Sequence, residues 1–278
     1  MQFDLRKRFK NLVKGLALWL FNISFRKFNH VLIVFFGPSH SRLEQIGNSA
    51  ILVCDKVNSN DVWCSQVGQI ANLLETFQID LIVDVGANHG QFALGIREIY
   101  AGEILSFEPV NSAFKALESL STSDQLWKIV KMALGDSESR LSIKVPESTD
   151  FSSFLSPNEF SRARFGSQVE VAQTEEVTVT RLSSFLIEHY PDLIKRRVFL
   201  KMDTQGYDLK VFEGATEILP SIKLVLSEVS LIPIYEGMPH WTDSISKYES
   251  KGFGVVGLYP VNKVGNQVIE FDCLMSVR

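Results

Sequence analysis

The stretch LIVDVGANHGQFALGI, residues 81–96, constrains the fold more than any other part of this chain. Its first five residues form a short apolar run, which is typical of a strand buried on both faces of a parallel sheet. Gly86 and Gly90 then let the backbone turn sharply, because neither residue has a Cβ atom. A helical pattern follows from Gln91. The stretch therefore predicts a strand, a tight turn, and a helix whose N-terminal amides face a ligand.

Apolar runs and amphipathic stretches alternate along the rest of the chain. This alternation predicts an α/β fold, with a parallel sheet covered by helices on both faces and joined by right-handed crossovers. Two strands in succession at the end predict an antiparallel pair added to that sheet. The expected strands are residues 81–85, 103–109, 127–135, 141–145, 175–180, 196–203, 222–229, 253–260 and 268–277. The expected helices are residues 61–78 and 91–100, one capped by Asn111, one near Asp208, and residues 244–250.

A long polar stretch, residues 146–168, interrupts this alternation. A loop of this length in a compact domain is often a lid or a binding loop. Its segment DFSSF, residues 150–154, could stack on a sugar ring or simply tether the loop. Arg162 and Arg164 could bind an anionic substrate, or they could be solvated.

The N-terminal part differs from the remainder. Apolar residues between Phe9 and Leu20 recur at helical spacing among basic residues, which predicts a basic, apolar helical extension over residues 1–59 and one catalytic domain over residues 60–278. The extension could pack on the domain or on a second subunit, or contact an anionic membrane surface. Without a cleavage site or a span long enough to cross a bilayer, we expect a cytoplasmic protein, peripheral at most to a membrane.

Bulk properties narrow the class of protein. The 278 residues carry a net charge of −4, which disfavours a dedicated nucleic-acid binder because phosphate contacts need a basic surface. Three cysteines without a CxxC pair or a metal-binding spacing indicate a reducing compartment.

The turn at residues 86–90 lacks the spacing of the dinucleotide fingerprint. Asp84 next to it disfavours a pyrophosphate and favours a cationic ligand such as S-adenosylmethionine (SAM), whose sulfonium is positive. Glu108 ends the next predicted strand, where a carboxylate can accept hydrogen bonds from both ribose hydroxyls. The two acids together indicate a SAM site.

Six motifs, in order, resemble a known family. VDVGANHGQFAL, SFEPV, MALGD, LKMDTQGYDLKVFEGA, SEVSLIPIYEG and DCLMSVR are similar to the FkbM-type SAM-dependent methyltransferases, from about residue 80 to the C-terminus. The resemblance implies the class I methyltransferase fold, a Rossmann-like, seven-stranded, mostly parallel sheet. It also implies O-methylation, often of sugar or polyketide hydroxyls.

The resemblance also assigns residues to the site. The residues that it places around the cofactor are Asp84, Gly86, Asn88 and Gly90 in the turn, Glu108 at the ribose, and Ala133, Leu134 and Asp136 near the adenine. Asp203 and Glu228 match the acids that end the fourth and fifth strands. The chain departs from the family after Asp203, since many members continue with Val-Glu-Gly-x-Glu where this chain has Thr-Gln-Gly-Tyr-Asp.

Methyl transfer to a hydroxyl requires positioning and a group that removes the proton. Asp203 and Glu228 could act as the general base, or as oxygen ligands of a divalent cation such as Mg²⁺, although no tight ligand cluster supports a metal. Either acid could instead anchor a neighbouring segment. His240 has the better intrinsic pKa for a base, and His89 lies in the turn, but both could be incidental.

The sequence thus predicts a SAM-dependent O-methyltransferase that acts on a sugar or glycan hydroxyl. The basic N-terminus is compatible with a lipid-linked glycan. Two alternatives remain open at this point. One is an NAD-dependent oxidoreductase on a similar sheet, which the glycine spacing disfavours. The other is a non-catalytic module that retains the fold.

Overall fold

The computed structural model describes the backbone of residues 24–28, 31–36, 41–46 and 49–54, and both backbone and side chains of residues 66–278. The chain divides into two compact units, residues 1–70 and 71–278. The candidate site residues all belong to the second unit.

Four strands form an antiparallel sheet in the first unit, in the order β1-β2-β3-β4. They are β1 Ser24–Phe28, β2 Val31–Phe36, β3 Ser41–Ile46 and β4 Ser49–Cys54. The prediction of a helical extension is wrong for these segments. The sequence of β2, VLIVFF, explains the difference, because β-branched and aromatic residues favour strands. The segment between Phe9 and Leu20, which carries the helical pattern and the predicted membrane contact, lies outside the described residues.

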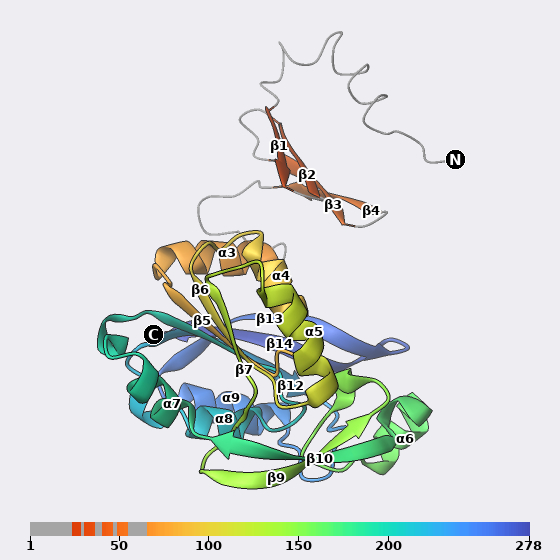
Figure 1. Ribbon diagram of the computed structural model, residues 1–278. Coiled ribbons are helices and arrows are strands. Elements are labelled where there is room, and N and C mark those ends of the chain that lie inside the picture. The colour runs from red at the N-terminus through yellow and green to blue at the C-terminus, as the bar shows by residue number, and fades with distance from the viewer. Residues whose placement is uncertain (1–23, 29–30, 37–40, 47–48, 55–65) are drawn as a thin grey trace. The chain divides into compact units, whose positions relative to one another are not determined.

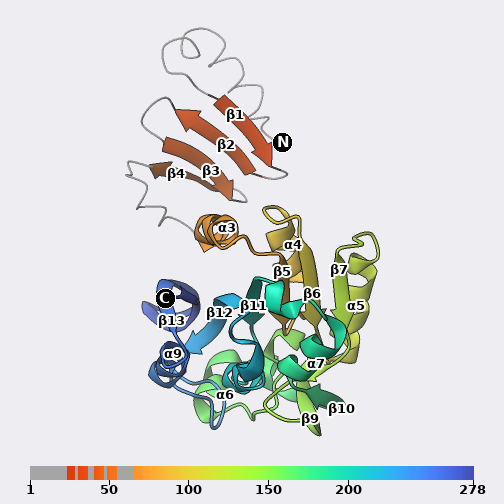
Figure 2. The same cartoon turned by 90° about the vertical axis from the view of Figure 1, so that its left-hand side faces the viewer.

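A seven-stranded sheet forms the centre of the second unit, in the order β13-β14-β12-β11-β5-β6-β7. Its strands are β5 Leu81–Val85, β6 Glu103–Phe107, β7 Trp127–Val130, β11 Val198–Met202, β12 Ile222–Ser230, β13 Phe253–Val264 and β14 Gln267–Val277. Figure 2 shows β12, β11, β5, β6 and β7 side by side. All neighbouring pairs from β12 to β7 are parallel, whereas β14 runs antiparallel to both β12 and β13. This order and this C-terminal antiparallel pair confirm the predicted class I methyltransferase fold.

Helices cover both faces of this sheet. The helices are α3 Gln66–Thr76, α4 Gln91–Arg97, α5 Asn111–Ser121, α6 Glu159–Phe165, α7 Leu182–His189, α8 Asp208–Glu213 and α9 Trp241–Glu249. Figure 1 shows α4 and α5 on one face and α7, α8 and α9 on the other. Every residue of β5 and β11 is buried, as expected for parallel strands covered on both faces. In the described part of the chain, no helix is both long and apolar enough to cross a membrane.

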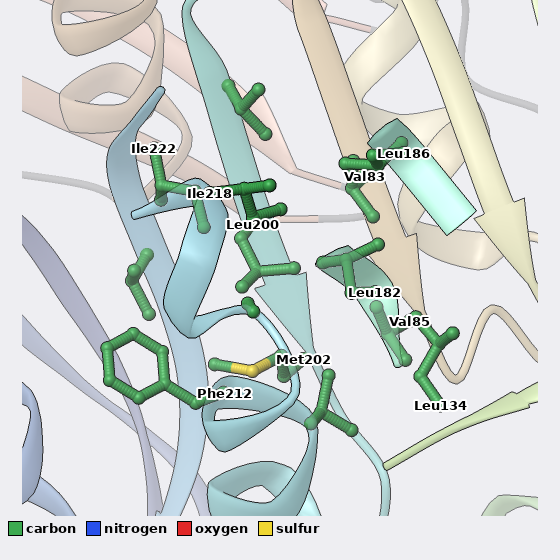
Figure 3. Packing of buried hydrophobic residues seen from close by; sticks show 14 of the residues in the cluster. Val83, Val85, Leu134, Leu182, Leu186, Leu200, Met202, Phe212, Ile218 and Ile222 are labelled. Carbon is green, nitrogen blue, oxygen red and sulfur yellow. The ribbon is translucent and has the colours of Figure 1, made fainter. Parts of the chain in front are cut away.

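The apolar core fixes the central strands. Figure 3 shows Val83 of β5 and Leu200 of β11 among the apolar side chains of the helices, including Leu182 of α7 and Phe212 of α8. Full burial of each such side chain contributes about 1.5–3 kcal/mol. The packed core therefore fixes the positions of the carboxyl ends of β5 and β11. The candidate site lies at these strand ends.

A second, three-stranded sheet has the order β8-β10-β9. Its strands are β8 Ala133–Leu134, β9 Ser139–Pro146 and β10 Val171–Thr180. The single strand predicted over residues 127–135 is thus split, because β7 stays in the main sheet while β8 pairs in parallel with β10. The predicted cap Asn111 is also wrong. It is the first residue of α5, and its N–H and side-chain amide donate to Glu175 of β10, at 3.0 and 2.6 Å.

Residues 147–170, between β9 and β10, form what we call the insert. It was expected as a loop, yet it holds α6 and two 3₁₀ turns, η1 Thr149–Phe151 and η2 Gly166–Val169. Asn158 caps α6 by accepting a hydrogen bond from the N–H of Ser161 at 2.9 Å. Two further 3₁₀ turns lie elsewhere, η3 Leu193–Lys195 and η4 Thr216–Ile218. The sequence did not reveal these elements, since helices this short depend on tertiary contacts.

Candidate active site

The turn after β5 is built from left-handed backbone conformations. Gly86 and Gly90 have φ angles of +72° and +85°, and Asn88 between them has +47°. The N–H groups of Gly86 and Ala87 donate to the carbonyl oxygen of Phe107 at 3.1 and 3.0 Å, which joins the turn to the end of β6. A Cβ atom on Gly86 would overlap the backbone oxygen of Asp203 at the end of β11. The turn therefore lies tightly between two strand ends, and Gly86 is required there.

Asp84 is fully buried next to this turn and binds Lys201. One carboxylate oxygen of Asp84 accepts a hydrogen bond from Ser106 at 3.1 Å, and the other lies 3.0 Å from the ammonium nitrogen of Lys201. Lys201 also donates to the carbonyl oxygen of Gly86 at 3.2 Å. Burial alone would lower the pKa of Lys201, but the charges of Asp84 and Asp203 outweigh it and raise that pKa above its ordinary value. Asp84 thus supports the turn through Lys201 and offers a ligand no exposed surface.

Glu108 follows β6 and is 5% exposed. Its two carboxylate oxygens accept the N–H groups of Asn88, at 2.8 Å, and of Val110, at 2.7 Å. Burial raises the pKa of Glu108 to about 7, although the two backbone N–H groups oppose this shift. Each oxygen retains a second lone pair, so the carboxylate can still accept hydrogen bonds from a diol. The structure thus brings Glu108 and the turn into direct contact.

The insert closes over the same turn. The side-chain amide of Asn88 donates to Asp150 at 2.5 Å, and its oxygen accepts from the hydroxyl of Thr149 at 2.8 Å. Gln91, at the start of α4, lies 3.5 Å from the same Asp150 oxygen. Residues about sixty positions away in the sequence therefore contact the turn. The role of the insert as a lid or a binding loop stays a prediction.

Ala133, Leu134 and Asp136, which the resemblance places near the adenine, offer less than expected. Ala133 and Leu134 are 5% and 2% exposed and belong to the apolar core. Asp136 forms an ion pair with Lys210 of α8 at 2.7 Å, and the hydrogen bond from Lys210 lowers the pKa of Asp136. The physical reason is that β8 leaves the main sheet to pair with β10. Any contact of Ala133 or Leu134 with a ligand would have to use the backbone.

Three side chains meet beyond β11 and β12. Asp203 follows β11, and its side chain is 43% exposed. The amide nitrogen of Gln205 donates both to Asp203, at 3.2 Å, and to Glu228 near the end of β12, at 3.0 Å. Gln205 itself has a φ of +52°. The structure thus brings together two predicted acids, Asp203 and Glu228, through a residue at which the chain departs from the family pattern.

The other polar atoms of Gln205 bind different segments. Its side-chain oxygen accepts a hydrogen bond from the hydroxyl of Tyr235 at 2.9 Å, and its backbone oxygen accepts one from Ser153 of the insert at 2.7 Å. The Tyr235 hydroxyl also lies 3.2 Å from the backbone oxygen of Phe151. Tyr235 is 2% exposed and packs in an apolar cluster with Phe151. The insert therefore contacts this part of the site as well as the turn.

Carboxyl groups dominate the charge in this region. Burial, and after it the neighbouring charge of Asp203, hold the pKa of Glu228 well above its ordinary value. Glu270 and Asp272 of β14 act in the same direction. Among residues 66–278, no group of three histidine, cysteine or acidic side chains is arranged to hold a metal ion.

The remaining candidates have surroundings of their own. His240 precedes α9, and its ring nitrogen pairs with the hydroxyl of Thr242 at 2.8 Å, so its recorded partner is local. His89 is exposed in the turn, and Arg162 and Arg164 are exposed on α6. Asp208 stands where the family motif has its second glutamate. It accepts hydrogen bonds from Thr204 and Ser227 and is 6% exposed.

The sequence patterns did not indicate Lys201 or Tyr235 as residues of the site. A signal for Lys201 was present, because a lysine within the apolar strand VFLKM must be paired if it is buried. Tyr235 and its contact with Gln205 had no such signal, because the partners are thirty positions apart on two loops.

Comparison with protein families shows that residues 84–254 match the model of the methyltransferase FkbM domain. Three solved structures resemble the fold. They are an rRNA methylase from Streptococcus thermophilus (10% identity, 77% of this chain and 97% of that chain, TM-score 0.41), magnesium protoporphyrin IX methyltransferase from Synechocystis PCC 6803 with bound SAM (8%, 76% and 78%, 0.41), and precorrin-6y C5,15-methyltransferase from Geobacter metallireducens GS-15 (11%, 80% and 93%, 0.39). Among curated proteins, no relative matches. The family match spans more than half of the chain and includes every candidate residue from Asp84 to His240.

Proposed function

The chain belongs to the methyltransferase FkbM domain family and is a SAM-dependent methyltransferase, and on that premise we propose that it methylates a hydroxyl oxygen of a sugar or glycan. The observation that carries this proposal is the pair of carboxylates, Asp203 directly after β11 and Glu228 within β12, which the side-chain amide of Gln205 joins. The oxidoreductase and the non-catalytic module have no comparable support, since the family match is to a methyltransferase.

The residues around the turn fit SAM by the chemistry of their donors and acceptors. We propose that Glu108 accepts hydrogen bonds from the ribose hydroxyls and that the turn from Gly86 to Gly90 lets the backbone approach the cofactor closely. When bound, SAM supplies an electrophilic methyl group on a sulfonium. The carboxylates near the turn favour a cationic ligand, because opposite charges attract most strongly where water is excluded.

Asp203 is the best candidate for the general base. Its side chain is 43% exposed. Glu228 is partly buried, and burial and the charge of Asp203 raise its pKa, so Glu228 is the acid more easily kept protonated. In this scheme Asp203 accepts the proton of the acceptor hydroxyl while the new oxygen–carbon bond forms and the methyl–sulfur bond breaks. His240 remains a second candidate, although its ring nitrogen pairs with Thr242.

The charge of the site supports an uncharged acceptor. Asp203 and Asp272, whose charges act on Glu228, would repel a phosphate at the reacting end, and the whole chain is acidic. Sugar hydroxyls, by contrast, donate hydrogen bonds to carboxylates. These features favour a glycan over RNA, although an rRNA methylase is among the similar structures.

Incubation with SAM labelled in the methyl group tests the proposal. The protein is mixed with a cell extract that has been separated into glycan, lipid, protein and RNA fractions. We expect label in the glycan or lipid-linked glycan fraction, released by glycosidases and stable to base, as an ether is. Label in RNA or protein alone would contradict the proposed acceptor. In parallel, S-adenosylhomocysteine should raise the melting temperature, and NADH should not.

A further inference from the structure

Gln205 has every polar side-chain atom engaged. Its oxygen faces the hydroxyl of Tyr235, and its nitrogen faces the carboxylates, which accept hydrogen bonds when they are ionised. The two N–H groups of that nitrogen face Asp203 and Glu228. The amide can therefore neutralise the repulsion between two carboxylates while it fixes their separation.

The backbone at this position is also held by the insert. Gln205 has a φ of +52°, a conformation that non-glycine residues adopt rarely and at a cost. The hydroxyl of Ser153 binds its carbonyl oxygen at 2.7 Å. At the next residue, Gly206, a Cβ atom would lie 2.9 Å from a methyl carbon of Leu155 in the insert. The conformation that directs the amide to the carboxylates thus depends on contacts with residues 153–155.

We propose that Gln205 is a positioning residue that holds Asp203 and Glu228 as a pair in the geometry needed for methyl transfer, and that it links this pair to closure of the insert through Tyr235 and Ser153. The inference deepens the proposed function and rests on it for the role of the two acids. In the family motif Val-Glu-Gly-x-Glu, the first glutamate stands at the position of Gln205 and would place a third carboxylate between Asp203 and Glu228. The glutamine makes a different arrangement, in which one neutral donor serves both.

The charges around Glu228 come from several elements. Asp203 follows β11, Asp208 lies in α8, and Glu270 and Asp272 lie in β14. Tyr235, after β12, is a neutral donor whose own pKa is raised by burial. All four acids disfavour ionisation of Glu228, whereas the Gln205 amide favours it by donating to the carboxylate. Replacement of the amide must therefore move the titration of Glu228 upward.

The first experiment measures that titration directly. The glutamate side-chain carboxyls of the full-length protein are labelled with ¹³C, the Glu228 resonance is assigned with Glu228→Gln, and its shift is followed against pH. In Gln205→Glu, which keeps the shape of the side chain, we expect the midpoint to rise by about one pH unit or more. Gln168→Glu adds the same charge at an exposed position of the insert and should leave the midpoint unchanged. An unchanged midpoint in Gln205→Glu would overturn the proposal.

The second experiment tests the link to the insert. Tyr235→Phe removes the hydroxyl that joins Gln205 to Phe151 and leaves both N–H donors in place. We expect faster hydrogen–deuterium exchange over residues 148–156, both with and without S-adenosylhomocysteine. If the exchange rate equalled that of the original protein, the proposed link between Gln205 and the insert would be contradicted.

Neither measurement requires the acceptor. If the original protein neither bound S-adenosylhomocysteine nor transferred label, only the proposed function would be contradicted. If the titration midpoint of Glu228 did not move in an active Gln205→Glu enzyme, only the role of Gln205 would be contradicted. In the active enzyme, Gln205→Glu should lower kcat and leave the affinity for SAM close to that of the original protein.

Discussion

The two halves of the candidate site are built in different ways. The half around the glycine turn consists of backbone bonds and buried charges from strands β5, β6 and β11, which are neighbours in the sheet. The half around Asp203 and Glu228 consists of side-chain bonds, through Gln205, to residues of the insert and of the loop after β12. The first half tolerates little change because its atoms are closely packed. The second can be adjusted by substitution of single side chains.

This difference suits the two tasks. Under the proposed function, the rigid half binds a cofactor of constant shape, and the half built from side chains on loops binds the acceptor. Variants of the turn half should therefore affect folding and cofactor binding, and variants of the other half should affect turnover. Four predictions test this division, from the largest effect to the smallest.

Asp203→Asn should affect turnover most. Loss of a general base lowers kcat by about 10²- to 10⁴-fold, and the amide keeps the shape of the side chain. The measurement is kcat with the acceptor found by the labelling experiment, together with calorimetry of SAM binding, which should change little. Asp243→Asn, an exposed acid of α9, is the matched control and should stay fully active. Normal turnover in Asp203→Asn would remove Asp203 from the chemistry.

Lys201→Met should lower the free energy of unfolding by about 3–5 kcal/mol, because it leaves the buried carboxylate of Asp84 without its partner. Urea denaturation gives this value. Lys128→Met is the control, since Lys128 pairs with Glu103 but is 59% exposed, and its loss should cost about 1 kcal/mol or less. A double variant, Asp84→Asn with Lys201→Met, should recover part of the loss. Equal effects of the two lysine variants would contradict the importance of the buried pair.

Gly86→Ala should destabilise the protein by about 2–5 kcal/mol, the sum of the cost of a left-handed conformation and of overpacking against Asp203. Gly95→Ala, five residues after Gly90 in α4, has no atom near its added Cβ and should instead stabilise the helix by about 0.5–1 kcal/mol. Thermal and urea unfolding of both variants make the comparison. If Gly86→Ala were as stable as Gly95→Ala, the turn would not be the rigid half.

Glu108→Gln should weaken binding of S-adenosylhomocysteine by about 1–3 kcal/mol. The pKa of Glu108 is raised to about 7, so its contribution to folding stability is largest below its ordinary pKa and is lost as the pH rises toward 7. Cofactor affinity has the opposite trend, because the ionised carboxylate is the better acceptor for ribose hydroxyls. Calorimetry between about pH 6 and about pH 8 should show affinity that rises with pH in the original protein and stays flat in Glu108→Gln. The same slope in both proteins would exclude Glu108 from ribose binding.

The sequence by itself determined the sheet, the turn and the acids at the strand ends. These follow from local patterns, since an apolar run that ends at an acid and two glycines can form few other structures. The split of residues 127–135 could not be obtained in this way, because β8 pairs with the distant strand β10. The strands over residues 24–54 pair with their neighbours in the sequence, and the helical pattern that precedes them was wrongly extended over them. The adenine contact at Leu134 stays a prediction, limited to backbone atoms because the side chain of Leu134 is buried in the core.

Only the tertiary structure decided the surroundings of each acid. Asp84 and Asp203 are equally plain in the sequence, yet one is sealed against Lys201 and the other stays 43% exposed. Gln205 stood out as a departure from a motif, and its function as a bridge became visible when the insert and the loop after β12 were placed beside it. Burial and hydrogen bonding depend on which groups meet in space, and groups that lie thirty to sixty positions apart meet only once the chain has folded.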